Sequence, residues 1–187
     1  MADSHSEQNK DADLVRQAAA GDHQAFGVLF DRYSLNIYRF LCSQVSDPYE
    51  AENLTSEVFL RAWQSLSSYK DQGYPFSSYL FRIARNAVID HRRKARIPVR
   101  PLHQVNIPAE DMDQPGEVLA KNVELNQLKE GLLGLKEVYR SVLILRFLIG
   151  LSSSEVSQIM GRSDGAVRVL QHRALKKLKQ LMLSKDK

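Results

Sequence analysis

The chain has 187 residues, of which 43% are hydrophobic and 26% charged, with a net charge of +4, and this fits a folded soluble protein of one medium domain or two small ones. Its densest apolar stretch, VLILRFLIGL, is interrupted by Arg146 and is too short to cross a membrane. The N-terminal MADSHSEQNKDAD lacks the apolar core of a signal peptide, so we expect a cytoplasmic protein without membrane insertion.

The first half of the chain shows helical periodicity after a polar start. Residues 1–12 are predicted to form a disordered arm, and residues 13–96 a helical lobe. Helix starts are expected at Asp22 and at Asp47, which precedes a proline. The expected helices of this lobe are 13–20, 22–44, 48–66 and 76–95.

Proline marks the boundary between this lobe and a second one. Four of the six prolines fall between residues 97 and 116, together with acidic side chains, so 97–115 is predicted to be an extended linker. Residues 116–187 form a second predicted lobe, in which Ser152 and Glu155 have the spacing of a capping box. Its expected helices are 117–133, 136–149, 152–160 and 164–183, which makes the whole chain all-α, with two small helical domains.

The small net charge hides two basic clusters. Residues 82–100 and residues 162–187 each carry a net charge of +6, so the rest of the chain carries −8. Two separated basic clusters indicate two contacts with a polyanion. The alternative is that both are solvated helix ends whose cations compensate the helix dipole, which explains one cluster more easily than two.

The stretch FSSYLFRIARNAVIDHRRKAR, residues 76–96, combines aromatics, a polar face and a basic end. On a helix its apolar face, predicted to be core, holds Leu80, Ile83, Ala84, Ala87 and Val88. The opposite face holds Arg82, Arg85, Asn86, Ile89, Arg93 and Arg96. Cations beside aromatic rings suit single-stranded nucleic acid. Phe76 and Tyr79 fit an ordinary core position at a helix start equally well.

A second basic stretch, SSSEVSQIMGRSDGAVRVLQHRALKKLK, has the spacing of a helix-turn-helix. With Gly161 as the turn glycine, Val156 and Met160 before it and Val167 and Leu170 after it take the packing positions. The second helix then presents a row of polar and basic side chains that suit the major groove and its phosphates: Ser163, Asp164, Arg168, Gln171, His172, Arg173, Lys176 and Lys177. An amphipathic helical hairpin is the alternative.

Together with YEAENLTSEVFLRAWQSL (49–66), these stretches resemble bacterial sigma factors of the extracytoplasmic-function (ECF) group in the sigma-70 family. The resemblance covers both lobes in order, from about residue 13 to residue 183. It implies that the first lobe is sigma region 2 and the second is region 4. It further implies a transcription initiation factor that binds core RNA polymerase through the β′ clamp and the β subunit and directs it to promoter DNA.

The resemblance also implies roles for individual residues. The helix 49–66 is similar to the polymerase-docking helix of the family, whose contacting positions are Asn53, Leu54, Ser56 and Glu57. The loop 67–78 resembles the one that captures a flipped −10 base, and the residues expected near −10 DNA are Phe76, Tyr79, Asn86, Asp90, Arg92 and Arg93. The −35 reader is the helix-turn-helix, with Ser163, Asp164, Arg168, Gln171, His172, Arg173 and Lys176.

The sequence shows no signs of catalysis or of a cofactor. It has no nucleophile–base pairing and no phosphate-binding glycine loop, so we expect a protein that is not an enzyme. Its five histidines are scattered without cysteine partners, so no metal site is expected. The single cysteine, Cys42, excludes an internal disulfide, and a buried apolar role is favoured for it.

Two other classes of function remain open from the residues alone: a stand-alone helix-turn-helix regulator and an interaction module that sequesters a partner. The linker favours a sigma factor. Two DNA-binding lobes about 70 Å apart would need a further protein surface, such as that of polymerase, to hold a 19-residue linker extended. Finally, the resemblance implies an anti-sigma factor, often membrane-anchored, that wedges between the two lobes or wraps around them.

Overall fold

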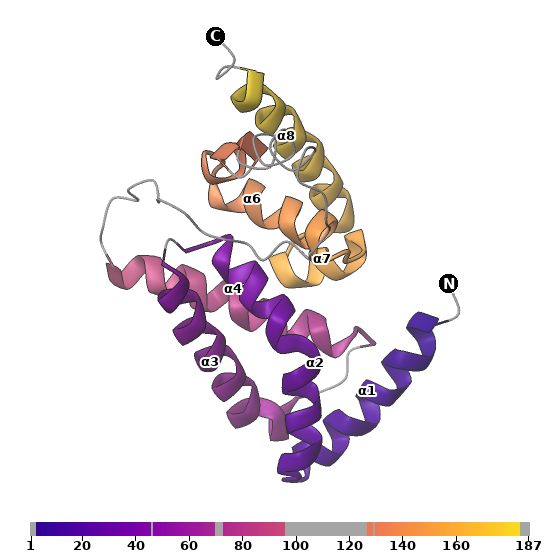
Figure 1. Ribbon diagram of the computed structural model, residues 1–187. Helices are drawn as coiled ribbons and strands as arrows, with labels where there is room; N and C mark the ends of the chain where they lie inside the picture. Colours follow the sequence, from indigo (N-terminus) through magenta and orange to yellow (C-terminus); the bar gives the residue numbers. More distant parts are fainter. Residues whose placement is uncertain (1–2, 46, 70–72, 96–126, 129, 184–187) are drawn as a thin grey trace, which may run out of the picture.

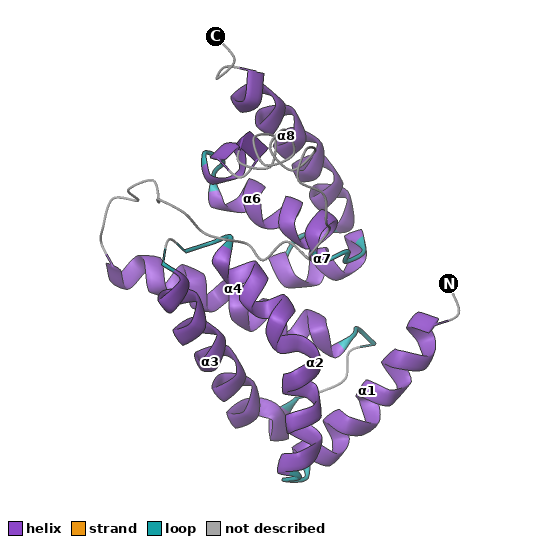
Figure 2. Cartoon of the chain, viewed as in Figure 1, coloured by secondary structure: helices purple, strands orange, loops and turns teal. Residues whose placement is uncertain are grey.

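The computed structural model describes residues 3–45, 47–69, 73–95, 127–128 and 130–183, and every regular element among them is a helix (Figures 1 and 2). This confirms the all-α prediction. The first half of the chain holds α1 (Asp3–Ala19), α2 (His23–Cys42), α3 (Pro48–Ser65), a 3-10 turn (Leu66–Ser68) and α4 (Phe76–Ala95). The second half holds α6 (Glu137–Leu143), a π-helical turn (Ile144–Leu148), α7 (Ser153–Met160) and α8 (Asp164–Leu183).

The helix starts expected from the sequence are confirmed by their capping bonds. The carboxylate of Asp22 accepts hydrogen bonds from the backbone N–H groups of Gln24 and Ala25 at the start of α2. Asp47 caps α3 in the same way, with a proline in the first turn. Ser152 and Glu155 form the reciprocal capping box at the start of α7. These bonds satisfy backbone donors that a helix leaves unpaired at its N-terminus.

The core of the first lobe lies between α2, α3 and α4. Its largest fully buried side chains include Phe40 of α2, Val58 of α3 and Phe81 of α4. The rings of Phe40 and Phe81 meet edge to face, with 5.7 Å between their centroids. The apolar face predicted for α4 is confirmed, because Leu80, Ala84, Ala87 and Val88 are buried and Ile83 is half-buried against the same core.

Helix α1 differs from the expectation, because it begins at Asp3 and includes most of the segment predicted to be a disordered arm. Asp11, near the end of that segment, is buried, and its carboxylate accepts hydrogen bonds from Arg32 and Tyr33 of α2. This attachment fixes the middle of α1 against α2, so that the preceding residues can continue the helix. A contact across 21 residues of chain leaves no local signal in the sequence.

The second lobe is a helix-turn-helix supported by α6. Val142, Val156, Ile159 and Val167 are fully or almost fully buried at its centre. Gly161 ends α7 with φ +61°, a left-handed conformation that glycine adopts without the strain a side chain would add. Around this turn the packing positions predicted from the sequence are confirmed: Val156, Met160 and Val167 are buried, and Leu170 packs partly buried against the core.

The two lobes lie against each other in the structure. Helix α4 of the first lobe packs on α7 of the second, where the orange and pink segments meet in Figure 1. Arg140 of α6 extends the junction, because its guanidinium donates a hydrogen bond to the carbonyl oxygen of Ser43 at the end of α2. The predicted linker, residues 97–115, lies outside the described residues.

Candidate nucleic-acid interface

A cavity of about 700 Å³ opens beside the start of α4. Its wall comes from the end of α3, the residues that follow it and α4, with one contribution from α7. Side chains of three kinds line it: aromatic rings, guanidinium groups and uncharged hydrogen-bonding groups. They include Arg61, Ser65, Tyr69, Tyr79, Arg82, Asn86 and Gln158. The volume falls within the roughly 300–1,000 Å³ that is common for small-molecule and cofactor sites.

Tyr79 is the centre of the aromatic wall. Its hydroxyl lies 2.6 Å from the Ser65 hydroxyl, and its ring centroid lies 4.8 Å from that of Tyr69. The guanidinium carbon of Arg82 lies 5.8 Å from the centroid of the same ring, within cation–π distance. A ring held on several sides keeps one orientation, which favours stacking with a flat ligand such as a nucleobase.

The structure separates the two aromatic residues that the sequence left ambiguous. Phe76 is 4% exposed and packs against Tyr33 and Tyr69, so it is a core residue that supports the cavity from behind. Direct contact with DNA, which the resemblance implied for Phe76, does not fit this burial. Tyr79 is half-buried and does both: it packs against Phe76 and lines the cavity.

The remaining residues expected near −10 DNA point in different directions. Asn86 is exposed and lines the cavity. Asp90 lies one turn further along and pairs with Arg93 at 3.2 Å and with Arg61 at 3.5 Å. Arg92 instead donates to the carbonyl oxygen of Gln44 at 2.7 Å, and burial lowers the pKa of its guanidinium. In this arrangement Arg92 is turned toward the end of α2.

Sequence reasoning missed Arg61, which joins two of the predicted sites. Its guanidinium donates to Glu57 at 2.5 Å, and the same group reaches Asp90 and lines the cavity. Arg61 follows Glu57 by four residues on one helix, so the pairing itself was visible in the sequence. The contact of Arg61 with Asp90 of α4 was not visible in the sequence, because the two residues lie far apart along the chain.

The exposed surface of helix α3 differs from the one expected for docking. Leu54 is 5% exposed and packs in the core, so its side chain is not on the surface. Of the other three residues expected to contact polymerase, Asn53 and Ser56 are exposed and Glu57 is half-buried. Two large apolar residues that the sequence did not single out share this face, Tyr49 and Leu60, which are 74% and 56% exposed. Tyr49, Asn53, Ser56 and Leu60 follow helical spacing, which was the available signal.

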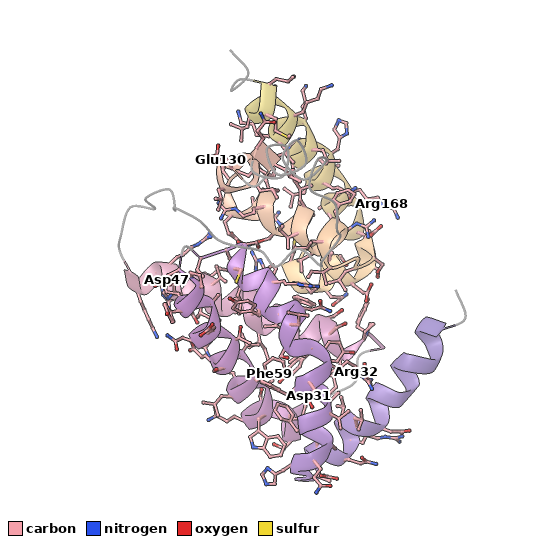
Figure 3. All side chains as sticks on the ribbon, in the orientation of Figure 1. Asp31, Arg32, Asp47, Phe59, Glu130 and Arg168 are labelled. Carbon is pink, nitrogen blue, oxygen red and sulfur yellow. The ribbon has the colours of Figure 1, made fainter. Side chains whose placement is uncertain are left out.

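Helix α8 presents the expected row of polar side chains. Arg168, His172, Arg173 and Lys176 are exposed, and Arg168 lies at the outer edge of the second lobe (Figure 3). Ser163 is exposed, and its hydroxyl accepts a hydrogen bond from the N–H of Ala166 at 3.2 Å, which caps the helix.

Three members of the row already have side-chain partners within the lobe. Asp164 pairs with Arg168 at 2.7 Å, and Gln171 is half-buried and accepts a hydrogen bond from Nε of Arg146 at 3.2 Å. Val169, which is 51% exposed among these residues, was missed, although an apolar side chain there can contact a thymine methyl group.

Among the described residues, no three His, Cys, Asp or Glu side chains gather as metal ligands would. No helix in that part of the chain is both long and apolar enough to span a bilayer. Cys42 is buried, as expected.

Comparison with known proteins assigns both lobes. Residues 29–97 match the family model Sigma-70 region 2, and residues 125–178 match Sigma-70, region 4. The ECF RNA polymerase sigma factor BldN of Streptomyces coelicolor is 34% identical over 91% of this chain, which spans 65% of BldN. ShbA of Streptomyces griseus is 34% identical over 90% of this chain and 93% of its own length. SigW of Bacillus subtilis is 30% identical over 89% of this chain and 93% of its own length.

A solved structure shares the fold over nearly the whole chain. CnrH, in complex with the cytosolic domain of CnrY, aligns with a TM-score of 0.72 and 27% identity over 95% of this chain and 99% of CnrH. The stand-alone helix-turn-helix regulator is not favoured, because it leaves the region 2 match of the first lobe unexplained. The chain belongs to the ECF group of sigma factors in the sigma-70 family, which are not enzymes but transcription initiation factors that direct RNA polymerase to promoters.

Proposed function

We propose that this sigma factor reads −10 DNA with the cavity beside α4, reads −35 DNA with α8 and docks on polymerase with α3. The observation that carries this division is the cavity itself. It brings aromatic rings, guanidinium groups and Asn86 together in the lobe that matches region 2. The row of basic side chains on α8 lies in the other lobe, which matches region 4.

At −10, the cavity would hold a base taken out of the duplex. The ring of Tyr79 offers a stacking surface, and Asn86 can donate and accept hydrogen bonds with a base edge. Arg61 and Arg82 line the same cavity and can neutralise the adjoining phosphates. Extruding a base costs a few kcal/mol, so selective capture of the right base gives sequence preference. Asp90 and Arg93 would contact DNA further along α4.

At −35, α8 would enter the major groove with the side chains near its N-terminus. Arg168 can donate two hydrogen bonds to a guanine, and Val169 can contact a thymine methyl group. Three further residues are candidates for contacting a base: Gln171, the half-buried Asp164 and the cap residue Ser163. The cations that follow would hold phosphates, and they are His172 when protonated, Arg173 and Lys176.

Polymerase docking would use the exposed face of α3. Asn53, Ser56 and Glu57 are proposed to contact the β′ clamp, with Tyr49 and Leu60 as apolar contacts at either end. Leu54, which is buried, would support this face from the core without contacting the partner. The β subunit is proposed to contact the second lobe.

The protein would work in the cytoplasm, where polymerase and promoter DNA are found. We further propose that it has an anti-sigma partner. CnrH, which shares the fold over nearly its whole length, is bound to the cytosolic domain of CnrY. Because the two lobes of this chain already lie in contact, a partner that wraps around them fits better than one that wedges between them.

The test is transcription by core polymerase reconstituted with this protein on its promoters, with Asn86→Ala and Arg168→Ala compared. Asn86→Ala is expected to slow strand opening about tenfold or more and to leave duplex −35 binding unchanged. Arg168→Ala is expected to weaken −35 binding by a similar factor and to spare opening on a template where the −35 contact is dispensable. Gln24→Ala, at an exposed position of α2, is the control. Equal losses from both variants on both templates would contradict the proposed division.

A further inference from the structure

One carboxylate lies at the junction between the lobes. Glu137, in the first turn of α6, faces α4, and its Oε1 lies 4.0 Å from Nε of Arg85. Both side chains are mostly buried, with 18% of Arg85 and 24% of Glu137 exposed. The same carboxylate favours the charged forms of Arg92 and Arg140, whose pKa values burial lowers, that of Arg140 to about 10. Glu137 thus lies beside Arg85 of the first lobe, and its charge favours the charged forms of Arg92 in the same lobe and of Arg140 in the second.

Two of these arginines converge on the end of α2. Arg140 donates to the carbonyl oxygen of Ser43 at 3.1 Å, and Arg92 donates to that of Gln44 at 2.7 Å. A helix leaves its last carbonyl groups unpaired and carries partial negative charge there, so two cations stabilise it. Arg140 is 7% exposed and also binds the carbonyl oxygens of Leu132, Leu133 and Leu135 in its own lobe. It thus ties the turn before α6 to the first lobe.

This junction shares residues with the surface assigned to −10 DNA. Arg92 is one of the residues expected near that DNA, and in the structure it is engaged at the junction. Gln158 of α7 lines the cavity whose other walls belong to the first lobe. Promoter DNA that follows α4 from the cavity toward Arg92 would therefore meet the second lobe.

We propose that one face of α4 binds two partners in turn. In the free protein the second lobe covers this face through the Glu137–arginine cluster, and the second lobe leaves it when promoter DNA binds. This inference rests on the proposed −10 role of α4. In the free protein the partner of this surface is the chain's own second lobe. The contact is electrostatic, between the carboxylate of Glu137 and the nearby arginines. DNA phosphates can pair with Arg85 and Arg92 of α4, so the second lobe and DNA would compete for these two arginines.

The test compares Glu137→Gln with Glu130→Gln. The first variant keeps the size of the side chain and an oxygen that can accept from Ser141, but it removes the charge that the three arginines share. The second makes the same change in net charge at an exposed position of the second lobe, away from the junction (Figure 3). Dyes on Asp31→Cys and Lys179→Cys, both exposed positions in different lobes, report lobe separation by energy transfer, while the native Cys42 is buried.

Glu137→Gln is expected to lower energy transfer and to bind a single-stranded −10 oligonucleotide about threefold tighter than Glu130→Gln does. The oligonucleotide should lower energy transfer in the wild type. Gln158→Arg, an exposed position that adds a cation to a cavity already lined by Arg61 and Arg82, should also lower energy transfer. Circular dichroism checks that each variant is folded.

Equal energy transfer in wild type, Glu137→Gln and Gln158→Arg would overturn the docked arrangement. Lower transfer in Glu137→Gln with unchanged oligonucleotide affinity would overturn the competition with DNA. If no protein binds the oligonucleotide, the proposed −10 role fails, and the energy-transfer comparison still decides whether Glu137 holds the lobes together.

Discussion

Single side chains in this molecule contribute both to the fold and to the proposed binding surface. Tyr79 shows this most clearly: one side of its ring packs against Phe76 in the core, and its hydroxyl meets Ser65 at the end of α3. The rest of the ring lines the cavity. The core therefore fixes the ring before a ligand arrives, and a fixed ring loses little conformational entropy on binding.

Two substitutions at Tyr79 separate the ring from its hydroxyl. Tyr79→Ala removes the stacking surface, and since stacking on an aromatic contributes about 1–3 kcal/mol per base, −10 oligonucleotide binding should weaken about tenfold or more. Tyr79→Phe keeps the ring and loses only the hydrogen bond to Ser65, so binding should weaken less than about threefold. Fluorescence anisotropy with a labelled oligonucleotide measures both. If Tyr79→Phe lost as much as Tyr79→Ala, stacking would not be the role of this residue.

At the scale of elements, helical periodicity predicted the core face of α4, and the spacing of Ser152 and Glu155 predicted the capping box of α7. Both features depend on residues that are close in sequence. The docking face of α3 was less well predicted. Leu54 was assigned to it by its position in the family motif, but a leucine pointing between helices is buried, while Leu60 points outward. Arg140 could not be foreseen at all, since the carbonyl it binds on Ser43 lies 97 residues away along the chain.

The exposed leucine of α3 gives a test of docking that leaves the core intact. Leu60→Asp should weaken binding to core polymerase about tenfold, because an apolar contact in an interface is replaced by a charge that must lose its water. Leu35→Asp is the matched control, as Leu35 is 50% exposed on α2. A pull-down with purified core polymerase measures the difference, with thermal unfolding to confirm the fold. Equal binding by the two variants would exclude Leu60 from the docking face.

The capping box of α7 predicts a local effect on stability. Ser152→Ala leaves the N–H of Glu155 without its side-chain acceptor, so the free energy of unfolding should fall by about 1 kcal/mol. In a protein of this size the Tm should then drop by roughly 2–4 °C. Ser154→Ala, at an exposed position of the same helix, is the control and should change the Tm by much less. Calorimetry that found the two variants equal would show that the cap contributes little to stability.

At the scale of the whole molecule, the contact between the lobes keeps them close together, whereas the spacing of promoter elements requires them to be far apart. Two promoter elements about two helical turns apart lie about 70 Å from each other along the DNA. Lobes joined through α4 and α7 cannot reach both elements at once. We therefore expect holoenzyme formation to separate the lobes, and the exposed face of α3, which is the proposed docking site, is accessible while the lobes are still in contact.

Energy transfer between dyes at Asp31→Cys and Lys179→Cys should accordingly fall when core polymerase is added, before any DNA is present. Leu60→Asp should shift this fall to about tenfold higher polymerase concentration, since it weakens docking and leaves the junction unchanged. Glu137→Gln should need less polymerase for the same fall, because part of its population is already open. Unchanged transfer in a holoenzyme that is active on promoters would mean that the lobes read DNA while still in contact, and the argument from promoter spacing would fail.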